Sequence, residues 1–108
     1  MSASIGDIFN WETVVPLDLN KTVTATGTPE ALADSEILFQ SLTITGNKAA
    51  QDPNSSTAYL GSSISQDIPI APGENIIVNA PEGKRMDLQN WYLRVGTNGD
   101  GVRGQYVI

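Results

Sequence analysis

The fold is decided by residues 91–108, which read WYLRVGTNGDGVRGQYVI. Apolar side chains occupy every second position over 91–95, and a similar alternation runs over 102–108, which is typical of half-buried strands. The segment between them, 96–101, contains an Asn-Gly and an Asp-Gly pair, the residues that tight hairpin turns prefer. The sequence therefore predicts a β-hairpin at the C-terminus.

Short apolar runs separated by turn residues continue outward from this segment. The chain has 10 Gly and 6 Pro, and most runs between breaks are about four to eight residues, which is strand length. The longest run, 36–45, has one apolar face that carries Leu38, Leu42 and Ile44. The other predicted strands are 57–60, 67–70, 74–79, 91–95 and 102–108, with less regular ones at 13–15 and 22–25.

Helical signals are confined to two short segments. Residues 28–34 have a capping Thr, a Pro at the first helical position and an early acid, which predicts one or two turns. Residues 86–90 fit a single turn. Neither segment has room for an amphipathic face. We therefore expect an all-β fold, an antiparallel β-sandwich or jelly-roll-like barrel with one or two single-turn helices.

The N-terminal segment departs from this pattern. A length of 108 residues allows one domain, and we assign residues 13–108 to a single β-sandwich. Residues 1–12 contain large apolar side chains with neither strand nor helix periodicity. We expect them to form an N-terminal arm that either caps the core or packs on a neighbouring subunit. These apolar residues are Ile5, Ile8, Phe9 and Trp11.

Composition excludes several classes of function. The chain has 12 acidic and 6 basic residues, a formal charge of −6, no His and no Cys. It therefore lacks an imidazole base, a thiolate nucleophile, a disulfide and the usual ligands of zinc, haem and iron–sulfur clusters. The acid excess argues against binding nucleic acid or an anionic membrane. Residues 1–7 lack a basic start and an apolar core, so we expect no signal peptide and synthesis in a cytoplasm.

Acidic residues suggest two kinds of site, and a structural role explains each better. Glycoside hydrolysis needs two carboxylates some 5–10 Å apart in a cleft. The candidate pairs are Asp67 with Glu74 and Glu82 with Asp87, but every acid lies beside a turn breaker or a strand end. We therefore expect no catalytic residue and no enzymatic activity.

Two loops offer oxygen ligands for calcium. They are 52–55 and 98–101, and neither has the acid spacing and bidentate Glu of a helix-loop-helix calcium site. The predicted hairpin already accounts for the second loop. We expect no metal and no other cofactor.

Aromatic residues are the remaining candidates. Trp91 shares its predicted strand face with Leu93, whereas Tyr92 and Arg94 share the opposite face. Tyr59 lies on another predicted strand. Exposed aromatic residues in a groove beside Asn or Asp would fit carbohydrate binding. They fit a subunit interface equally well, because Tyr, Trp and Arg are enriched there.

The order of motifs over residues 40–108 resembles that of small β-sandwich proteins of tailed-phage virions, among them head decoration (cement) proteins and fibre-type modules. Residues 42–60, LTITGNKAAQDPNSSTAYL, are similar to a strand, a polar loop and a second strand of that pattern. Residues 69–78, PIAPGENIIV, resemble the turn that follows it. The segment 88–106 resembles its last two strands.

This resemblance implies a non-enzymatic virion protein, first of all a homotrimeric capsid decoration protein on the capsid exterior. Its partners would be copies of itself and the major capsid protein, bound across capsomer joints. The alternatives are a carbohydrate-binding tip or fibre module and a minor connector or tail protein. We expect the interface to include Ile5, Ile8, Phe9, Trp11, Tyr59, Tyr92 and Arg94.

Overall fold

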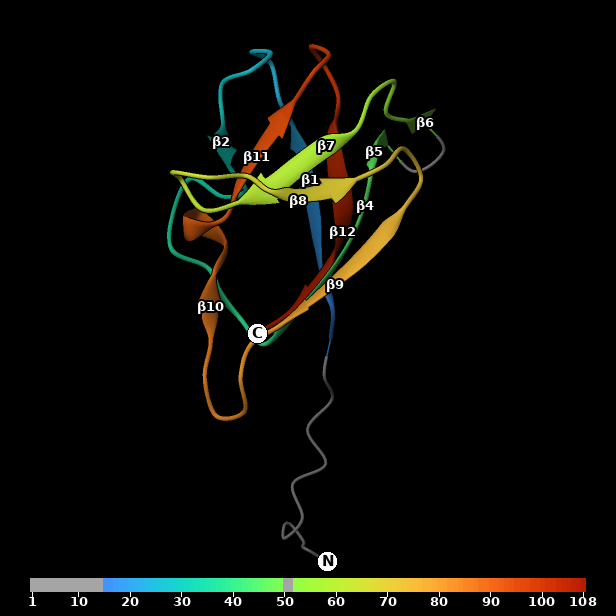
Figure 1. Ribbon diagram of the computed structural model, residues 1–108. Helices are drawn as coiled ribbons and strands as arrows, with labels where there is room; N and C mark the ends of the chain where they lie inside the picture. The colour runs from blue at the N-terminus through green and yellow to red at the C-terminus, as the bar shows by residue number, and fades with distance from the viewer. Residues whose placement is uncertain (1–14, 50–51) are drawn as a thin grey trace, which may run out of the picture.

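The computed structural model describes residues 15–49 and 52–108 (Figure 1). The regular secondary structure of the described residues is twelve strands and one short 3-10 helix, which confirms the all-β class. The expected arm at 1–12 and most of the expected strand at 13–15 lie outside the described residues, and so do Ile5, Ile8, Phe9 and Trp11.

Two four-stranded antiparallel sheets form the body of the protein. Sheet A has the order β1 (Leu17–Thr22), β12 (Gly101–Val107), β4 (Ser41–Thr45), β9 (Asn75–Asn79). Sheet B has the order β2 (Glu30–Ala31), β11 (Tyr92–Val95), β7 (Ala58–Gly61), β8 (Ile68–Ile70). Two small ribbons pair β10 (Met86–Asp87) with β3 (Leu38–Phe39) and β5 (Asn47–Ala49) with β6 (Asp52–Pro53).

The hydrophobic core lies between sheets A and B. In Figure 1, β7 and β8 run across the direction of β1 and β12. Alternation along each strand sends every second side chain inward, and these side chains form one cluster. Sheet A contributes Leu19, Leu42, Ile44 and Val102, and sheet B contributes Ala58, Leu60, Ile70, Leu93 and Val95. The arrangement is sandwich-like, as expected.

The predicted C-terminal hairpin is wrong, although both of its strands exist. β11 pairs with β2 and β7 in sheet B, whereas β12 pairs with β1 and β4 in sheet A. The turn between them crosses from one layer to the other. Long-range hydrogen bonds hold it: Gly99 N donates to Val23 O at 2.9 Å, and Val23 N donates to Asp100 O at 2.9 Å.

The predicted strand at 36–45 is divided at Gln40. The part before it, β3, pairs with β10, and the part after it, β4, pairs with β12 and β9. Phe39 and Leu42 are both fully buried, although an odd and an even position of one regular strand would face opposite ways. The break therefore reverses the alternation and lets both side chains reach the core.

Residues 28–34 form no helix, contrary to expectation. Glu30–Ala31 is instead the edge strand β2, and Leu32 N donates to Trp91 O at 2.8 Å. Leu32 is buried in the core. Since a helix of one or two turns is marginal alone, these tertiary contacts outweigh its local signals.

The order of strand and loop over 16–25 is also reversed. β1 occupies Leu17–Thr22, largely the segment between the two expected strands 13–15 and 22–25, and the chain is irregular beyond Thr22. β1 pairs with β12 along its whole length and buries Leu19. The position of β1 is therefore set by its pairing with β12 and not by the local amino-acid composition.

The short turn predicted at 86–90 is found over its last three residues, whereas Met86–Asp87 form strand β10. The 3-10 helix η1 spans Leu88–Asn90, and Leu88 is fully buried. The Asp87 carboxylate caps it by accepting a hydrogen bond from Gln89 N at 3.0 Å. The same oxygen accepts from Ile37 N at 3.0 Å, so one side chain fixes both the cap and the start of the neighbouring ribbon.

Candidate functional site

The outer face of sheet B brings together three residues expected at an interface. Arg94 lies directly opposite Tyr59 in the β11–β7 register, and Tyr92 lies opposite Gly61. Since Leu93 and Val95 are buried in the core, Tyr92 and Arg94 point away from it. All three side chains are half-buried. We call Tyr59, Tyr92 and Arg94 the aromatic patch.

A cation–π contact orders this patch. The guanidinium carbon of Arg94 lies 4.7 Å from the centroid of the Tyr59 ring, within the range of a favourable interaction. Arg94 Nη2 also lies 3.5 Å from the carbonyl oxygen of Gln66, to which it donates. The Arg94 side chain is therefore held between a neighbouring strand and a loop.

The loop at 62–66 borders the aromatic patch. It passes so close to Gly61 that a β-carbon there would overlap the carbonyl oxygen of Ser65. Gln66 Nε2 donates to Ser62 O at 2.7 Å and closes the loop. Ile64 on this loop is 93% exposed. Sequence reasoning missed Ile64; its signal is a single apolar residue among serines in a turn.

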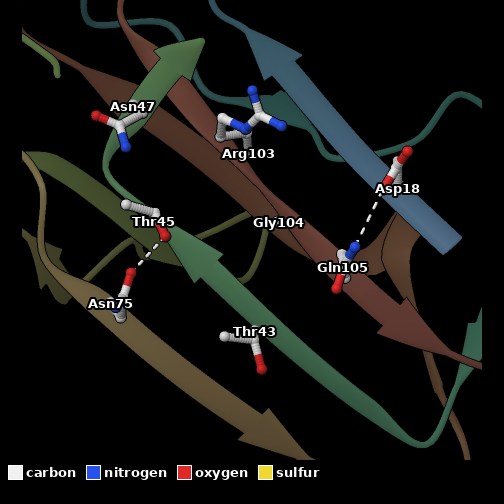
Figure 2. Close-up of a pocket in the computed structure, with 8 residues that line it drawn as sticks. All are labelled: Asp18, Thr43, Thr45, Asn47, Asn75, Arg103, Gly104 and Gln105. Carbon is white, nitrogen blue, oxygen red and sulfur yellow. Dashed lines mark hydrogen bonds between the residues drawn. The ribbon is translucent and has the colours of Figure 1, made fainter. Parts of the chain in front are cut away.

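The outer face of sheet A carries a polar depression of about 410 Å³ (Figure 2). Side chains from β1, β4, β5, β9 and β12 surround it. Gln105 Nε2 donates to Asp18 Oδ1 at 3.4 Å, and Thr45 Oγ1 donates to Asn75 Oδ1. Among the side chains that the structure describes, which exclude those of residues 1–14 and 48–52, Arg103 forms no ion pair. The lining residues are Asp18, Thr43, Thr45, Asn47, Asn75, Arg103, Gly104 and Gln105.

The two surfaces lie on different sheets. The polar depression has no aromatic lining residue, and Tyr59 and Tyr92 belong to the outer face of sheet B. The carbohydrate alternative expects aromatic rings beside Asn or Asp in one groove. Among the residues that line the polar depression, the structure does not bring those groups together.

Three of the four candidate catalytic carboxylates accept hydrogen bonds within turns or caps. Asp67 Oδ2 accepts from Ser65 Oγ at 2.6 Å, and Glu74 Oε1 accepts from Ala71 N at 2.8 Å. Asp87 caps η1 as described above, and Glu82 is exposed. Turn formation and capping therefore account for three of these four carboxylates.

One carboxylate has an environment that the sequence does not indicate. Asp100 is 0% exposed and accepts hydrogen bonds from the backbone N–H and the hydroxyl groups of Ser55 and Ser56. Burial on its own raises the pKa of Asp100, but these donors outweigh it and hold the pKa below that of an ordinary Asp. A fully buried carboxylate is closed to ligands, so Asp100 is structural.

The described residues contain no cluster of three acidic side chains placed to hold a metal ion. In that same part of the chain, no helix has the length and apolarity needed to cross a membrane. Comparison with models of protein families, with curated proteins and with solved structures gave no match.

Proposed function

We propose that the protein is a structural component of a tailed-phage particle, a decoration protein that binds the capsid exterior across capsomer joints. The observation that carries the proposal is the aromatic patch, in which Arg94 stacks on Tyr59 and Tyr92 follows on the same strand face. The motif order over residues 40–108 supplies the virion setting. Capsid binding requires no chemical reaction, so the absence of His and Cys from the chain is compatible with this function.

The aromatic patch suits protein binding for a physical reason. Tyr and Arg are the residue types that most often carry the binding energy of interfaces. Here they lie on paired strands rather than on a mobile loop, and the stacking contact already restricts the Arg94 side chain. A partner that covers them therefore loses less side-chain entropy than it would on ordering free side chains.

The proposal is tested by mixing the purified protein with capsids assembled without it. We expect saturable binding at symmetric positions, and the saturation ratio gives the number of copies at each site, which is three if the trimer expectation holds. Absence of any binding would overturn the proposal. Recovery of the protein from the tail or connector instead would favour the minor connector or tail role.

Substitution in the aromatic patch should weaken capsid binding. We expect Tyr59→Ala and Arg94→Ala each to lower the affinity by about tenfold or more, since interface hot spots contribute roughly 2 kcal/mol each. Arg103→Ala on the outer face of sheet A is the matched control and should bind as the wild type does. Titration of labelled protein against capsids measures all three. A loss confined to Arg103→Ala would assign binding to the polar depression instead.

Deletion of residues 1–12 tests the expected role of the arm. We expect the shortened chain to keep its β circular dichroism and lose capsid binding, because the apolar residues of this segment are proposed to dock on the shell. A deletion that unfolds the domain would assign the segment to the core. A deletion that folds and binds normally would leave docking to the aromatic patch alone.

The polar depression favours a second candidate function, a carbohydrate-binding tip or fibre module. Its lining offers amide, hydroxyl, carboxylate and guanidinium groups from five strands, and such groups make the hydrogen bonds that fix a sugar. Screening against immobilised glycans tests it. Binding that Asn75→Ala abolishes and Arg94→Ala leaves unchanged would support this function over capsid decoration.

A further inference from the structure

Strand β9 is an edge of sheet A. Its sequence is Asn75-Ile76-Ile77-Val78-Asn79, and it pairs only with β4 among the described strands. A free edge presents unpaired backbone groups, and proteins generally protect such edges from pairing with another chain. We therefore compared β9 with the other edge strands for features that prevent pairing with another chain.

The register shows which backbone groups of β9 are not bonded to β4, its one partner among the described strands. Gly46 N donates to Glu74 O at one end of the β4–β9 ladder, and Ala80 N donates to Gln40 O at the other. Hydrogen-bonded pairs alternate along an antiparallel ladder, so the even-numbered residues of β9 bond to β4. The N–H and C=O groups of Asn75, Ile77 and Asn79 therefore point away from the sheet.

The other three edges carry devices that discourage pairing. β1 has the charged residues Asp18 and Lys21, and β8 is three residues long with Pro69 at its centre. β2 has two residues, and its Glu30 forms an ion pair with Lys21 at 3.0 Å. Charge, proline and short length are the usual protections of an edge strand. β9 has five residues with no charge and no proline.

The sequence of β9 is complementary to itself. We propose that β9 pairs antiparallel with β9 of a second copy of this chain, about a two-fold axis through Ile77. In that register, Ile77 faces Ile77, and Asn75 faces Asn79 of the second copy. These are the three residues whose backbone groups point outward, so the pairing satisfies every free N–H and C=O of β9 and joins the two A sheets into one.

The side chains of β9 fit the same register. Ile77 is 66% exposed on the outer face, and pairing places it against its symmetry mate. Ile76 and Val78 lie on the core side and are half-buried. In the proposed register, Ile76 of each copy faces Val78 of the other, so the apolar layer on the core side of sheet A continues across the interface. Since residues 75–79 carry no charge, no like charges oppose each other.

This contact is independent of the proposed function. A two-fold interface uses the same patch on both copies, whereas capsid binding is assigned to the aromatic patch on sheet B. The dimer is proposed for the protein in solution, whereas the expected count of three applies to copies bound at one capsid site.

Sedimentation equilibrium and amide hydrogen exchange test the proposal together. We expect a particle with twice the mass of one chain, which dissociates on dilution. At concentrations that favour the dimer, the amides of Asn75, Ile77 and Asn79 should become protected from exchange, and on dilution they should lose that protection. The amides of Ile76 and Val78 should stay protected in both states, because they bond to β4 within one chain.

Ile77→Lys and Ile77→Pro are the decisive variants. The first opposes two charges across the axis, and the second removes an outward N–H without breaking a bond to β4. We expect each to raise the dissociation constant at least about tenfold. Thr43→Lys is the matched control, since Thr43 is exposed and pairs with Ile77 one strand further in; it should leave the dimer unchanged.

Three results would overturn the proposal. One is a single-chain mass at the highest soluble concentration. Another is a dimer or trimer in which the amides of Asn75, Ile77 and Asn79 exchange as freely as on dilution. The third is an assembly that folded Ile77→Lys and Ile77→Pro leave intact. Capsid binding is scored on Arg94→Ala, so the two proposals can fail separately.

Discussion

Replacement of Asp100 with Ala is expected to lower the free energy of unfolding by about 3 kcal/mol or more. The substitution removes a fully buried side chain and leaves the partly buried N–H and hydroxyl donors of Ser55 and Ser56 without their shared acceptor. A polar group left unsatisfied away from water costs about 1–3 kcal/mol. Domains of this size are stable by roughly 5–15 kcal/mol. The loss is therefore a large part of the total.

The loop that contains Ser55 and Ser56 also binds β12 through Asn54, so Asp100 is part of a hydrogen-bond network. Asn54 is buried, and its side chain donates to Gly101 O at 2.8 Å and accepts from Gly101 N at 2.9 Å. Residues 54–56 thus bind the point at which the chain passes from sheet B to sheet A. We therefore expect the loss of Asp100 to weaken the contact between this loop and the connection from sheet B to sheet A, and not only the turn at 96–101.

Urea denaturation of matched variants measures this effect. Asp100→Asn keeps the side-chain shape but turns an amide NH₂ toward other donors, and should cost about 1–3 kcal/mol. Asp34→Asn removes the same charge from an exposed position whose carboxylate accepts no hydrogen bond from the described residues, and should stay within about 0.5 kcal/mol of the wild type. Stability of Asp100→Ala within about 1 kcal/mol of the wild type would contradict the structural role.

The Asp100 network also predicts a pH dependence. The pKa of Asp100 is lower in the folded protein than in an ordinary Asp, so the folded state favours the ionised form. Its contribution to stability is complete above the unfolded pKa of about 3.9 and disappears as the pH falls through the lower folded pKa. The stability difference between the wild type and Asp100→Asn should therefore shrink below about pH 4.

Replacement of Gly104 with Ala is the second substitution with a large expected effect. Gly104 lies in the middle of β12, with Leu19 on one side and Ile44 on the other. A β-carbon there would overlap the carbonyl oxygen of Thr43 and lie 2.9 Å from the Cα of Ile44. Both atoms are backbone, so relief requires β4 to move away from β12. We expect a loss of at least about 3 kcal/mol or failure to fold.

Gly96→Ala is the control for this prediction. Its β-carbon would lie 3.5 Å from the Ser56 hydroxyl, an ordinary contact, and Gly96 has no positive φ. The same substitution should therefore change the unfolding free energy by less than about 1 kcal/mol. Thermal denaturation compares the two variants. A folded Gly104→Ala as stable as Gly96→Ala would show that β12 and β4 can separate without cost.

The candidate sites were predictable only in part. Alternation along residues 91–95 places Tyr92 and Arg94 on one face, and the structure agrees because that period is a property of the strand itself. Tyr59 joins them through the register of β7 with β11, which no local pattern sets. The polar depression depends on five strands from distant parts of the chain, so it was not foreseen.

Residues 91–108 show where the sequence by itself was sufficient. Alternation and turn residues determined the all-β class, the last two strands and the turn between them, because these follow from side-chain period and backbone preference within a few residues. The turn chemistry of Asn98 to Gly101 favoured a hairpin, but only the tertiary structure decided the pairing. Asp100 binds Ser55 and Ser56, and Gly99 binds Val23. Those distant contacts, together with the core buried between the layers, place β11 and β12 in different sheets.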